Sequence, residues 1–573
     1  MSDDFQVSGT TAAAPFTLKL HRGDGMTLVA MNWKTARPPD DFVGFAIEYR
    51  EPGGDRFFAL KNRINFPGPN GAVDSARLST LLSPIQKFRW VHFPRNASLN
   101  GAFLYRVTPM FMNSENELSQ GVAQEAAIEL RRETYPGQLN VCYTRGFVSS
   151  QAFVDRYDKF GPISTLLPDD ADDGLNFKPT HPRTAEALAW MGFEAREALL
   201  DALDRAIEDK AEVRVIAYDL NVPEIVGRLE KIGARLKIII DDSPDDHGKP
   251  DSAETAAAAR LTVSAGVLNV KRQHMSSLQH NKTIVVDGPT IKRVVCGSTN
   301  MSWRGLFVQA NNAMVLEGAS AVKLFRDAFD TYFDNPGKFG TSASAKMTDL
   351  GLSHIDARVA FSPHAASNAL LKKIADDIGD NTTSCLFYSL AFLYETKGVI
   401  KDAIIKVTGD PTRFVYGISD KKVGGIVLQK PDGNLAPVFA AALVKNVPPP
   451  FSEEPTALVP KGGGTRMHHK FVVIDFDKPT ARVWLGSYNF SGTADTKNGE
   501  NLLLINDRRI VVSYTIEALR IFDHYHFRVA QQDAKKAKKV LQLLRPPRQA
   551  SEKAWWDEDY TEPLKIRDRE LFA

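Results

Sequence analysis

The chain of 573 residues contains only three cysteines, and its charges almost cancel. Cys142, Cys296 and Cys385 lack the C-x-x-C spacing of zinc ligands and can form at most one bridge, so we expect them to be reduced, small apolar residues. The 71 Lys and Arg residues against 69 Asp and Glu residues give a formal net charge of +2. Because this balance produces no broad electrostatic field, any attraction for phosphate must be local.

Long apolar runs and a recognisable leader are also lacking. The longest apolar stretch, residues 385–394, is about half of the roughly 20 residues that a bilayer span needs. The first residues, MSDDFQVSGTTAAAPF, show no basic region followed by an apolar one, as a secretory signal would. We therefore expect a soluble, cytoplasmic chain without a transmembrane segment. The apolar content of 43% suffices for large cores and excludes a disordered chain.

Residues 15–135 are expected to form an all-β sandwich domain after a flexible N-terminus, residues 1–14. Apolar and polar residues alternate, with turns of glycine and proline between them, over 16–20, 27–33, 42–49 and 103–107. Alternation with period two predicts strands, and a series of such short strands predicts a β-sandwich. Trp33 on an early strand and Tyr105 on a late one resemble a fibronectin type III or immunoglobulin-like module. Another kind of all-β domain is an equal alternative.

After residue 138 the pattern changes to strands that alternate with helices. The expected elements are a strand, a helix, a strand, a helix and a strand over 139–143, 184–208, 213–218, 223–233 and 236–240. Such alternation predicts an α/β layer with helices on both faces of a sheet. The pattern restarts near residue 357, so we predict two α/β halves, 138–345 and 355–545. The tail, residues 546–573, contains two adjacent tryptophans and is expected to pack on the body.

One motif, H-x-K-x4-D followed by G-S-x-N, occurs twice. Its residues are His280, Lys282, Asp287, Ser298 and Asn300 in the first copy, and His468, Lys470, Asp475, Ser487 and Asn489 in the second. Residues two apart on an extended strand point to the same face, so each copy presents one imidazole and one ammonium together. A polar strand edge without function is disfavoured, because both copies carry the matching downstream asparagine.

The doubled motif resembles that of the phospholipase D superfamily, over roughly residues 138–545. The resemblance implies two α/β sandwich halves related by a pseudo-twofold axis, with both histidines beside one phosphorus. It further implies a metal-independent hydrolase that needs no cofactor and forms a covalent phosphohistidine. The interval between the motif aspartate and the Gly-Ser pair is nine residues in one copy and ten in the other. That interval is longer than in the commonest family pattern, so the subfamily stays open.

The same resemblance assigns roles to the other motif residues. The two lysines and the two asparagines are expected to hold the non-bridging oxygens of the phosphate. Asp287 and Asp475 are expected to be structural, as residues of turns and hydrogen bonds. Ser298 and Ser487 either form hydrogen bonds within the hairpin or assist the intermediate.

The two histidines need different protonation states, because one attacks phosphorus and the other supplies a proton to the leaving oxygen. Glu500 stands fourteen residues after Gly486, and Asn311 stands at the same offset from Gly297. A carboxylate favours an imidazolium, whereas an amide orients the ring without charge. We therefore expect Glu500 to pair with His468, the general acid, and Asn311 to pair with His280, the nucleophile.

The substrate class depends on less evidence than the chemistry does. Our leading hypothesis is a phospholipase D that hydrolyses a phospholipid, or transfers it to an alcohol, with peripheral membrane contact. The first alternative is a nuclease or other nucleic-acid phosphodiesterase. The second is a catalytically silent binding protein that uses the β-sandwich, although no motif residue is lost. A monomer with an internal pseudo-dimer would hold the complete site.

Three further segments could bind ligands but have simpler explanations. The acidic runs 169–173 and 241–247 could attract a cation, but they lack EF-hand spacing and are expected to be solvated loops. The glycine-rich segment 461–464 lacks the Walker spacing. It is expected to be a loop that lines the cleft or an ordinary surface connection. No metal site is predicted.

Overall fold

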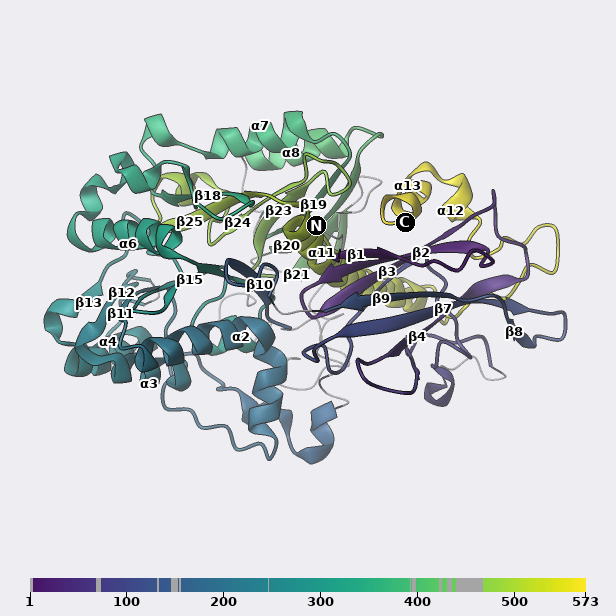
Figure 1. Cartoon of the computed structure of the whole chain (residues 1–573), viewed down its shortest axis with the longest axis horizontal. Coiled ribbons are helices and arrows are strands. Elements are labelled where there is room, and N and C mark those ends of the chain that lie inside the picture. Colours follow the sequence, from purple (N-terminus) through teal and green to yellow (C-terminus); the bar gives the residue numbers. More distant parts are fainter. Residues whose placement is uncertain are drawn as a thin grey trace. The chain divides into compact units, whose positions relative to one another are not determined.

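The chain divides into two compact units, Met1–Arg132 with Val512–Ala573, and Glu133–Val511. The structure, a computed structural model, describes residues 4–68, 74–130, 133–145, 153, 156–245, 247–391, 393, 398–421, 425–429, 435–438 and 467–573 (Figure 1). The glycine-rich segment 461–464 lies outside these residues. None of the helices described there has the length and hydropathy needed to cross a bilayer. Cys142, Cys296 and Cys385 are buried and form no disulfide with one another, as expected.

The N-terminal part of the first unit consists of two antiparallel sheets. One sheet has the order β1 (Gln6–Ser8), β2 (Phe16–Gly23), β3 (Met26–Trp33) and β6 (Arg89–His92). The other has the order β5 (Phe58–Ala59), β4 (Phe42–Arg50), β7 (Ala102–Met112) and β8 (Leu118–Gln120), and β9 (Gln124–Glu129) also pairs with β7. Side chains of both sheets share one core, among them Phe16, Met31, Phe45 and Tyr105. The likeness to a fibronectin or immunoglobulin module stays a prediction.

The N-terminus is more ordered than the predicted flexible segment 1–14. Strand β1 lies within that range and pairs antiparallel with β2, with Gln6 opposite His21. The backbone N–H of Arg22 also donates to the carbonyl of Phe5 at 2.8 Å. These hydrogen bonds satisfy backbone polar groups of the strand. The amino-acid composition of residues 1–14 does not predict this pairing.

The C-terminal tail belongs to the same unit and completes its core. Helices α12 (Glu558–Thr561) and α13 (Pro563–Leu571) follow two tryptophans. Trp555 Nε1 donates to the carbonyl of Phe42 at 3.1 Å, and Trp556, which is 4% exposed, lies in the core cluster of the β-sheets. Val511, the last residue of the second unit, lies inside the long helix α11 (Arg508–Lys536), and the predicted limit at residue 545 stays a prediction.

Replacing Trp556 with alanine is expected to destabilise the first unit by about 3–5 kcal/mol, because the change leaves a cavity where a buried indole was. The measurement is the thermal unfolding midpoint of the full chain, with Trp556→Phe as the control that keeps a ring. An unchanged midpoint in the alanine variant would show that the tail adds nothing to this core.

The first half of the second unit is a mixed sheet between helices. Its strands have the order β10 (Leu139–Tyr143), β16 (Asn312–Glu317), β15 (Lys292–Gly297), β14 (Thr283–Asp287), β11 (Glu212–Ala217), β12 (Leu236–Ile240) and β13 (Val270–Arg272). Among these, β11, β12 and β13 run parallel. Helix α2 (Thr184–Glu208) lies on one side of the sheet and α6 (Ala319–Asp334) on the other (Figure 1). Helices α3 (Pro223–Ile232), α4 (Ala253–Ala265) and α5 (Trp303–Phe307) complete this half.

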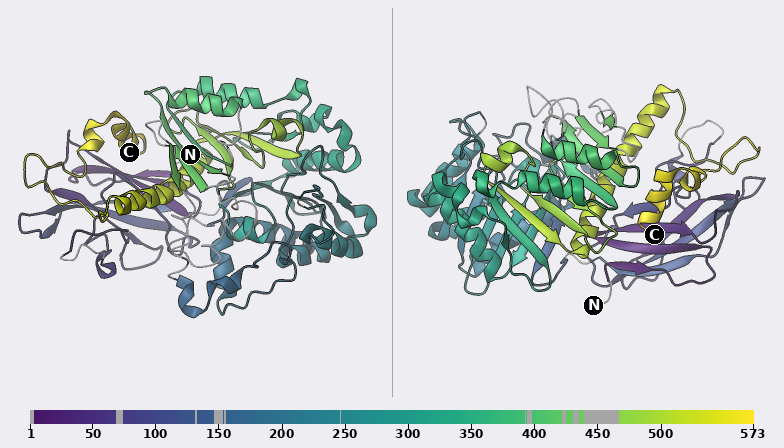
Figure 2. Two further views of the ribbon diagram at one scale, coloured as in Figure 1. Left: turned by 180° about the vertical axis from the view of Figure 1, so that it is seen from behind. Right: turned by 90° about the horizontal axis from the view of Figure 1, so that it is seen from above.

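The second half has a longer sheet with a similar centre. Its strands have the order β17 (Thr348–Asp349), β18 (Asp356–Ser362), β25 (Glu500–Asn506), β24 (Arg482–Gly486), β23 (Lys470–Ile474), β19 (Cys385–Leu390), β20 (Phe414–Lys421), β21 (Gly425–Gln429) and β22 (Leu435–Val438). Helices α7 (Leu371–Asn381) and α8 (Val399–Thr408) lie side by side (Figures 1 and 2) and share a core with the strands. The short helix α10 (Gly492–Thr496) precedes β25.

The two sheets repeat one topology. The order β10-β16-β15-β14-β11-β12 in the first corresponds to β18-β25-β24-β23-β19-β20 in the second. In each half the motif histidine and lysine stand at the start of a hairpin, β14–β15 or β23–β24, and the motif aspartate stands near its turn. The mixed α/β architecture agrees with the prediction, and the pseudo-twofold axis stays a prediction.

Candidate active site

The two motif histidines lie together at one cleft. His280 precedes β14 and His468 precedes β23, and their side chains are nearly buried. Their ring centroids are 6.2 Å apart. Both rings line a cleft of about 510 Å³. The structure thus brings two residues that are far apart in the sequence to a distance that one small group can span.

Two backbone bridges join the halves beside these rings. Gln279, before the first histidine, forms a parallel bridge with Gly499, and Met467, before the second, forms one with Ala310. The N–H of Gly499 donates to the carbonyl of Leu278 at 2.9 Å. Each motif histidine is therefore placed next to the first residues of a strand from the other half.

This crossing reverses the predicted pairing. His280 Nδ1 donates to Glu500 Oε2 at 2.8 Å, and His468 Nδ1 donates to Asn311 Oδ1 at 2.9 Å. The prediction that Glu500 pairs with His468 and Asn311 with His280 is wrong. Because Glu500 and Asn311 have the same offset from their own motifs, the spacing alone could not tell a partner in the same half from one in the other.

The serine of each Gly-Ser pair holds the acceptor of the opposite histidine. Ser487 Oγ donates to Glu500 Oε2 at 2.7 Å, and Ser298 Oγ donates to Asn311 Oδ1 at 2.9 Å. Both hydroxyls are fully buried. Each serine therefore orients a residue that in turn orients a ring. These hydrogen bonds lead to the start of β25 and to the residue before β16 rather than staying within the hairpin, and a role in assisting the intermediate stays a prediction.

The glycine of each pair is required by the backbone. Gly297 has φ +131° and Gly486 has φ +143°, a region that side chains disfavour. A Cβ at these positions would lie 2.7 Å from the carbonyl oxygen of Asn312 and 2.2 Å from that of Asn501. The close approach allows the hairpin strand to pass directly beside the strand that carries the histidine's partner.

Electrostatics leave His280 neutral with its outer nitrogen free. Burial lowers the pKa of His280, and the charge of Lys282 lowers it further, although Glu500 opposes both. Burial raises the pKa of Glu500, but the hydrogen bonds from His280 and Ser487 and the charge of Lys282 outweigh it, and the net shift is downward. An ionised carboxylate only accepts, so Nδ1 carries the imidazole proton and Nε2 keeps its lone pair. This is the state of a nucleophile.

The surroundings of His468 also act against the charged form of its ring, contrary to the expectation of an imidazolium. Burial, followed by the charges of Lys470 and Lys282, lowers the pKa of His468 well below its ordinary value. Its Nδ1 faces two acceptors, the carbonyl of Ser298 at 3.1 Å and Asn311 Oδ1. The carboxylate that was expected to favour the charged form of His468 is beside the other ring. A phosphodiester anion next to His468 would supply that negative charge.

Acid is expected to destabilise this unit through the two rings. An unfolded histidine takes up a proton below about pH 6.5, whereas the folded rings resist it, so stability is lost as the pH falls below that value. Each site contributes at most ~1.4 kcal/mol per pH unit, a slope that is approached only below pH 6.5. Denaturant unfolding between pH 7 and 5.5 should therefore show a smaller loss in His468→Gln than in the natural chain. Equal slopes would contradict the neutral state of His468.

The motif lysines are buried and are not among the residues that line the cleft. Lys282 Nζ donates to the carbonyl of His280, and Lys470 Nζ donates to that of His468 at 2.8 Å. Both are at most 3% exposed. Burial lowers the pKa of Lys282 to about 8, and its ammonium lies 4.6 Å from the ring centroid of Tyr218. Direct contact of these lysines with phosphate oxygens stays a prediction.

The motif asparagines reach the cleft with unused acceptors. Asn300 and Asn489 both line the cleft. Asn300 Nδ2 donates to Asp219 Oδ2 at 2.7 Å, so one of its two amide hydrogens is already committed. Within the described part of the chain, the Oδ1 atoms of both asparagines are buried without a hydrogen-bond partner. A bound group could therefore contact the two amides.

The motif aspartates lie at the other end of their strands. Asp287 pairs with Lys292 and with Arg326, whose NH1 is 2.6 Å away. Asp475 is fully buried and accepts from Ser384 N and from Thr383 Oγ1, each at 2.7 Å. Each aspartate stands five positions after its lysine along an extended strand, about 17 Å. Their contacts are with the scaffold, and the structural role stays the expectation.

The sequence reasoning missed a second polar group in this cleft. Asp219, His247 and Glu254 line it from the segments after β11 and β12 and from the start of α4. Burial lowers the pKa of His247, but hydrogen bonds to Asp219 and Asp241 outweigh it and raise this pKa to about 10. Burial raises the pKa of Asp219, but His247 outweighs it and lowers this pKa to about 2. The sequence could have indicated Asp219 and His247, because they follow predicted parallel strands and α/β proteins bind ligands beyond the carboxyl ends of such strands.

The prediction of a solvated loop over 241–247 is accordingly wrong at its two ends. Asp241 is fully buried and accepts from Gln279 N at 2.6 Å and from His247 Nδ1 at 2.9 Å. Residues 169–173 are exposed, as expected. Of the remaining histidines, His469 is fully buried and its ring packs edge-on against Tyr143.

Comparison with known proteins supports a phospholipase D-like domain around this site. Residues 199–333 and 447–522, which contain both motifs, match the family described as cardiolipin synthase, PLD-like domain. A phospholipase D of Rickettsia prowazekii (strain Madrid E) is 45% identical over 47 residues, which are 8% of this chain and 21% of that protein. The chain thus spans about a fifth of this curated relative's length. These matches support the phospholipase D superfamily.

Solved structures with some likeness include two enzymes of related description. Phosphatidylserine synthase of Haemophilus influenzae Rd KW20 has 12% identity and a TM-score of 0.40, over 61% of this chain and 92% of that one. Nuc, a phospholipase D family member of Salmonella typhimurium, has 26% identity and a TM-score of 0.20, over 24% of this chain and 85% of that one.

Proposed function

We propose that this chain is a phosphodiesterase of the phospholipase D type, which releases or exchanges the headgroup of a phospholipid through a covalent phosphohistidine. The observation that carries the proposal is the crossed arrangement in which His280 is held by Glu500 and His468 by Asn311 across one cleft. Two imidazoles with different partners suit a reaction that needs one nucleophile and one proton carrier.

In the first step His280 Nε2 attacks phosphorus, and the bond from phosphorus to the leaving oxygen breaks. The ring becomes cationic as the P–N bond forms, and the Glu500 carboxylate at Nδ1 stabilises that charge. His468, protonated when the phosphate anion is bound, gives its Nε2 proton to the leaving oxygen. The alcohol leaves, and the phosphoryl group stays on His280.

The second step reverses the roles. His468, now neutral, removes a proton from water, the resulting nucleophile attacks phosphorus, and the P–N bond breaks. An alcohol in place of water gives transfer instead of hydrolysis. The buried ammonium groups of Lys282 and Lys470 and the amides of Asn300 and Asn489 would stabilise the charge on the phosphate oxygens. Neither step requires a metal ion.

The relatives of this chain favour a phospholipid over a nucleic acid. The matching family is described as cardiolipin synthase, PLD-like domain, and the curated relative is a phospholipase D. The lining of the cleft carries both signs of charge, with Asp219 and Glu254 beside His247, Lys249 and Arg304, so these described residues form no continuous basic channel for a nucleic-acid strand. A lipid diester presents a single phosphate at this point and needs no such channel.

The test incubates the full-length chain with mixed phosphatidylcholine, phosphatidylethanolamine and phosphatidylglycerol vesicles or with single-stranded DNA, in EDTA. We expect release of a headgroup, detected by mass spectrometry, intact DNA, and no release by His280→Ala. DNA cleavage that His280→Ala abolishes would replace the lipid substrate with a nucleic acid. Failure to turn over either substrate would count against the proposed function.

A further inference from the structure

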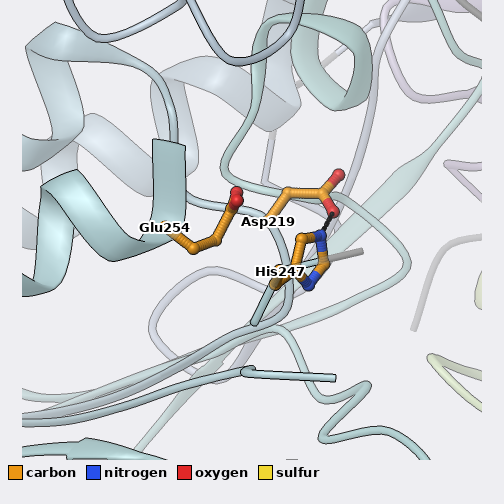
Figure 3. A group of neighbouring side chains, drawn as sticks. All are labelled: Asp219, His247 and Glu254. Carbon is orange, nitrogen blue, oxygen red and sulfur yellow. Dashed lines mark ion pairs between the residues drawn. The ribbon is translucent and has the colours of Figure 1, made fainter. Parts of the chain in front are cut away.

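Three side chains with metal-ligating atoms meet in the cleft outside the motif pair. Asp219, His247 and Glu254 each present one such atom, and these atoms all lie within 4.8 Å of one another (Figure 3). The proposed reaction uses none of them. They come from three separate segments, namely the ends of β11 and β12 and the first turn of α4, so the fold rather than a local run assembles them.

In each of these three residues, one polar atom is held by a hydrogen bond to the surrounding scaffold, and the other remains as a possible metal ligand. Asp219 Oδ2 accepts from Asn300 Nδ2 at 2.7 Å and from Ser302 Oγ at 3.0 Å, which leaves Oδ1. Glu254 Oε1 accepts from the N–H of Leu220 at 2.9 Å, which leaves Oε2. His247 Nδ1 is held by a buried carboxylate, so that Nε2 points to Asp219 Oδ1 at 3.2 Å.

An independent observation indicates that something is bound beside this group. Asn300 is 3% exposed, and its Oδ1 has no hydrogen-bond partner among the described residues. The same amide donates to Asp219 and lines the cleft with the three residues. A buried acceptor without a partner is costly, and a metal-bound water or the ion itself would satisfy it.

We propose that Asp219, His247 and Glu254 bind one divalent transition-metal ion, such as Zn²⁺ or Mn²⁺. One imidazole nitrogen with two carboxylate oxygens is a donor set that these ions accept, whereas Ca²⁺ and Mg²⁺ prefer oxygen alone. The 3.2 Å between His247 Nε2 and Asp219 Oδ1 equals the spacing of neighbouring ligands around an ion with bonds of about 2.0–2.2 Å.

The surroundings of His247 are those of a metal-binding histidine. Asp241, which is fully buried, accepts from Nδ1 at 2.9 Å and so fixes the ring with Nε2 toward the other two ligands. Such a carboxylate–histidine pair is the usual support of a metal ligand. In the absence of an ion, a proton on Nε2 would hold His247 to Asp219 in the same place.

The ion would connect three segments and would present a fixed positive charge in the cleft beside Asn300. It would stabilise the ends of β11 and β12 against the start of α4. The attack by His280 does not pass through it, so the chemical step proposed above proceeds without the ion.

The test uses the metal-stripped full-length chain and titrates it with Co²⁺, followed by visible absorption, and then displaces Co²⁺ with Zn²⁺. We expect one equivalent per chain, and binding at least about 10-fold weaker in Glu254→Gln and in His247→Gln, as loss of a ligand predicts. The matched control is His274→Gln, since His274 forms a similar pair with Asp242 at 2.7 Å outside the group. Zn²⁺ should raise the unfolding midpoint of the control but not of Glu254→Gln.

Two results would overturn the site, namely no bound ion, or equal binding by Glu254→Gln and the natural chain. The group would then be a hydrogen-bonded ion-pair network only. Glu254→Gln keeps the size of the side chain, and so decides the question where His247→Gln fails to fold. His280→Ala should bind Co²⁺ normally. Headgroup release without metal binding would refute only this site, and metal binding without turnover would refute only the proposed function.

Discussion

Replacing His280 with alanine is expected to lower kcat/KM for a phosphodiester by about 10⁴-fold or more, because the reaction loses its covalent nucleophile. The substrate for this measurement is a small diester with a chromogenic leaving group, which reports the chemical step directly. His274→Gln, a substitution outside the cleft, should leave the rate unchanged. A rate within tenfold of the natural chain's would exclude His280 as the attacking group.

The intermediate can be located with the partner variant. His468→Ala removes the proton carrier, which is expected to cost about 10²–10⁴-fold with a poor leaving group and much less with a good one. The phosphoryl group should then accumulate on the protein and map by mass spectrometry to residue 280. A phosphohistidine at residue 468 would reverse the two roles.

Replacing Glu500 with glutamine is expected to slow the reaction by about 10²-fold or more. The amide keeps the size of the side chain but supplies no negative charge to the cationic ring that forms on His280. The variant should be measured by stopped flow, since the loss falls on formation of the intermediate. The pH dependence of kcat/KM should change with it, because the carboxylate no longer opposes burial of the ring.

The converse substitution, Asn311→Asp, is the matched control for the crossed pairing. It places a carboxylate beside His468 and should raise the apparent pKa of the acid in the pH profile, because a negative neighbour favours an imidazolium. Formation of the intermediate should change less than in Glu500→Gln. If the two variants exchanged these effects, each acceptor would serve the histidine of its own half, and the crossed geometry would be wrong.

The sequence predicted the members of the site better than their partners. The doubled spacing identified His280 and His468 because a short period-two motif depends only on local strand geometry. The bridges of Gln279 with Gly499 and of Ala310 with Met467 join segments far apart in the chain, and no local pattern encodes them. The spacing alone was therefore compatible with a pairing of Glu500 with either histidine. The structure shows that the partner is His280.

Burial was the other quantity that residue type did not predict. Asp241 and His247 belong to an acidic run that resembles a solvated loop, yet Asp241 is fully buried and His247 is largely buried. Strand β1 is the opposite case, since it was expected to be flexible but gains hydrogen bonds from β2. In both cases a neighbour distant in sequence decided the outcome, as tertiary contacts commonly override local preference.

The crossed bridges make the two halves mutually dependent. A fragment that ended after α6 would retain His280 but not Glu500, and the remaining fragment would retain His468 without Asn311. Neither fragment could hold its imidazole in a defined tautomer, so each would be inert, and activity could return only by complementation when both are mixed. Damage to one half would therefore also disable the histidine of the other half, so neither half can be lost without loss of the whole site.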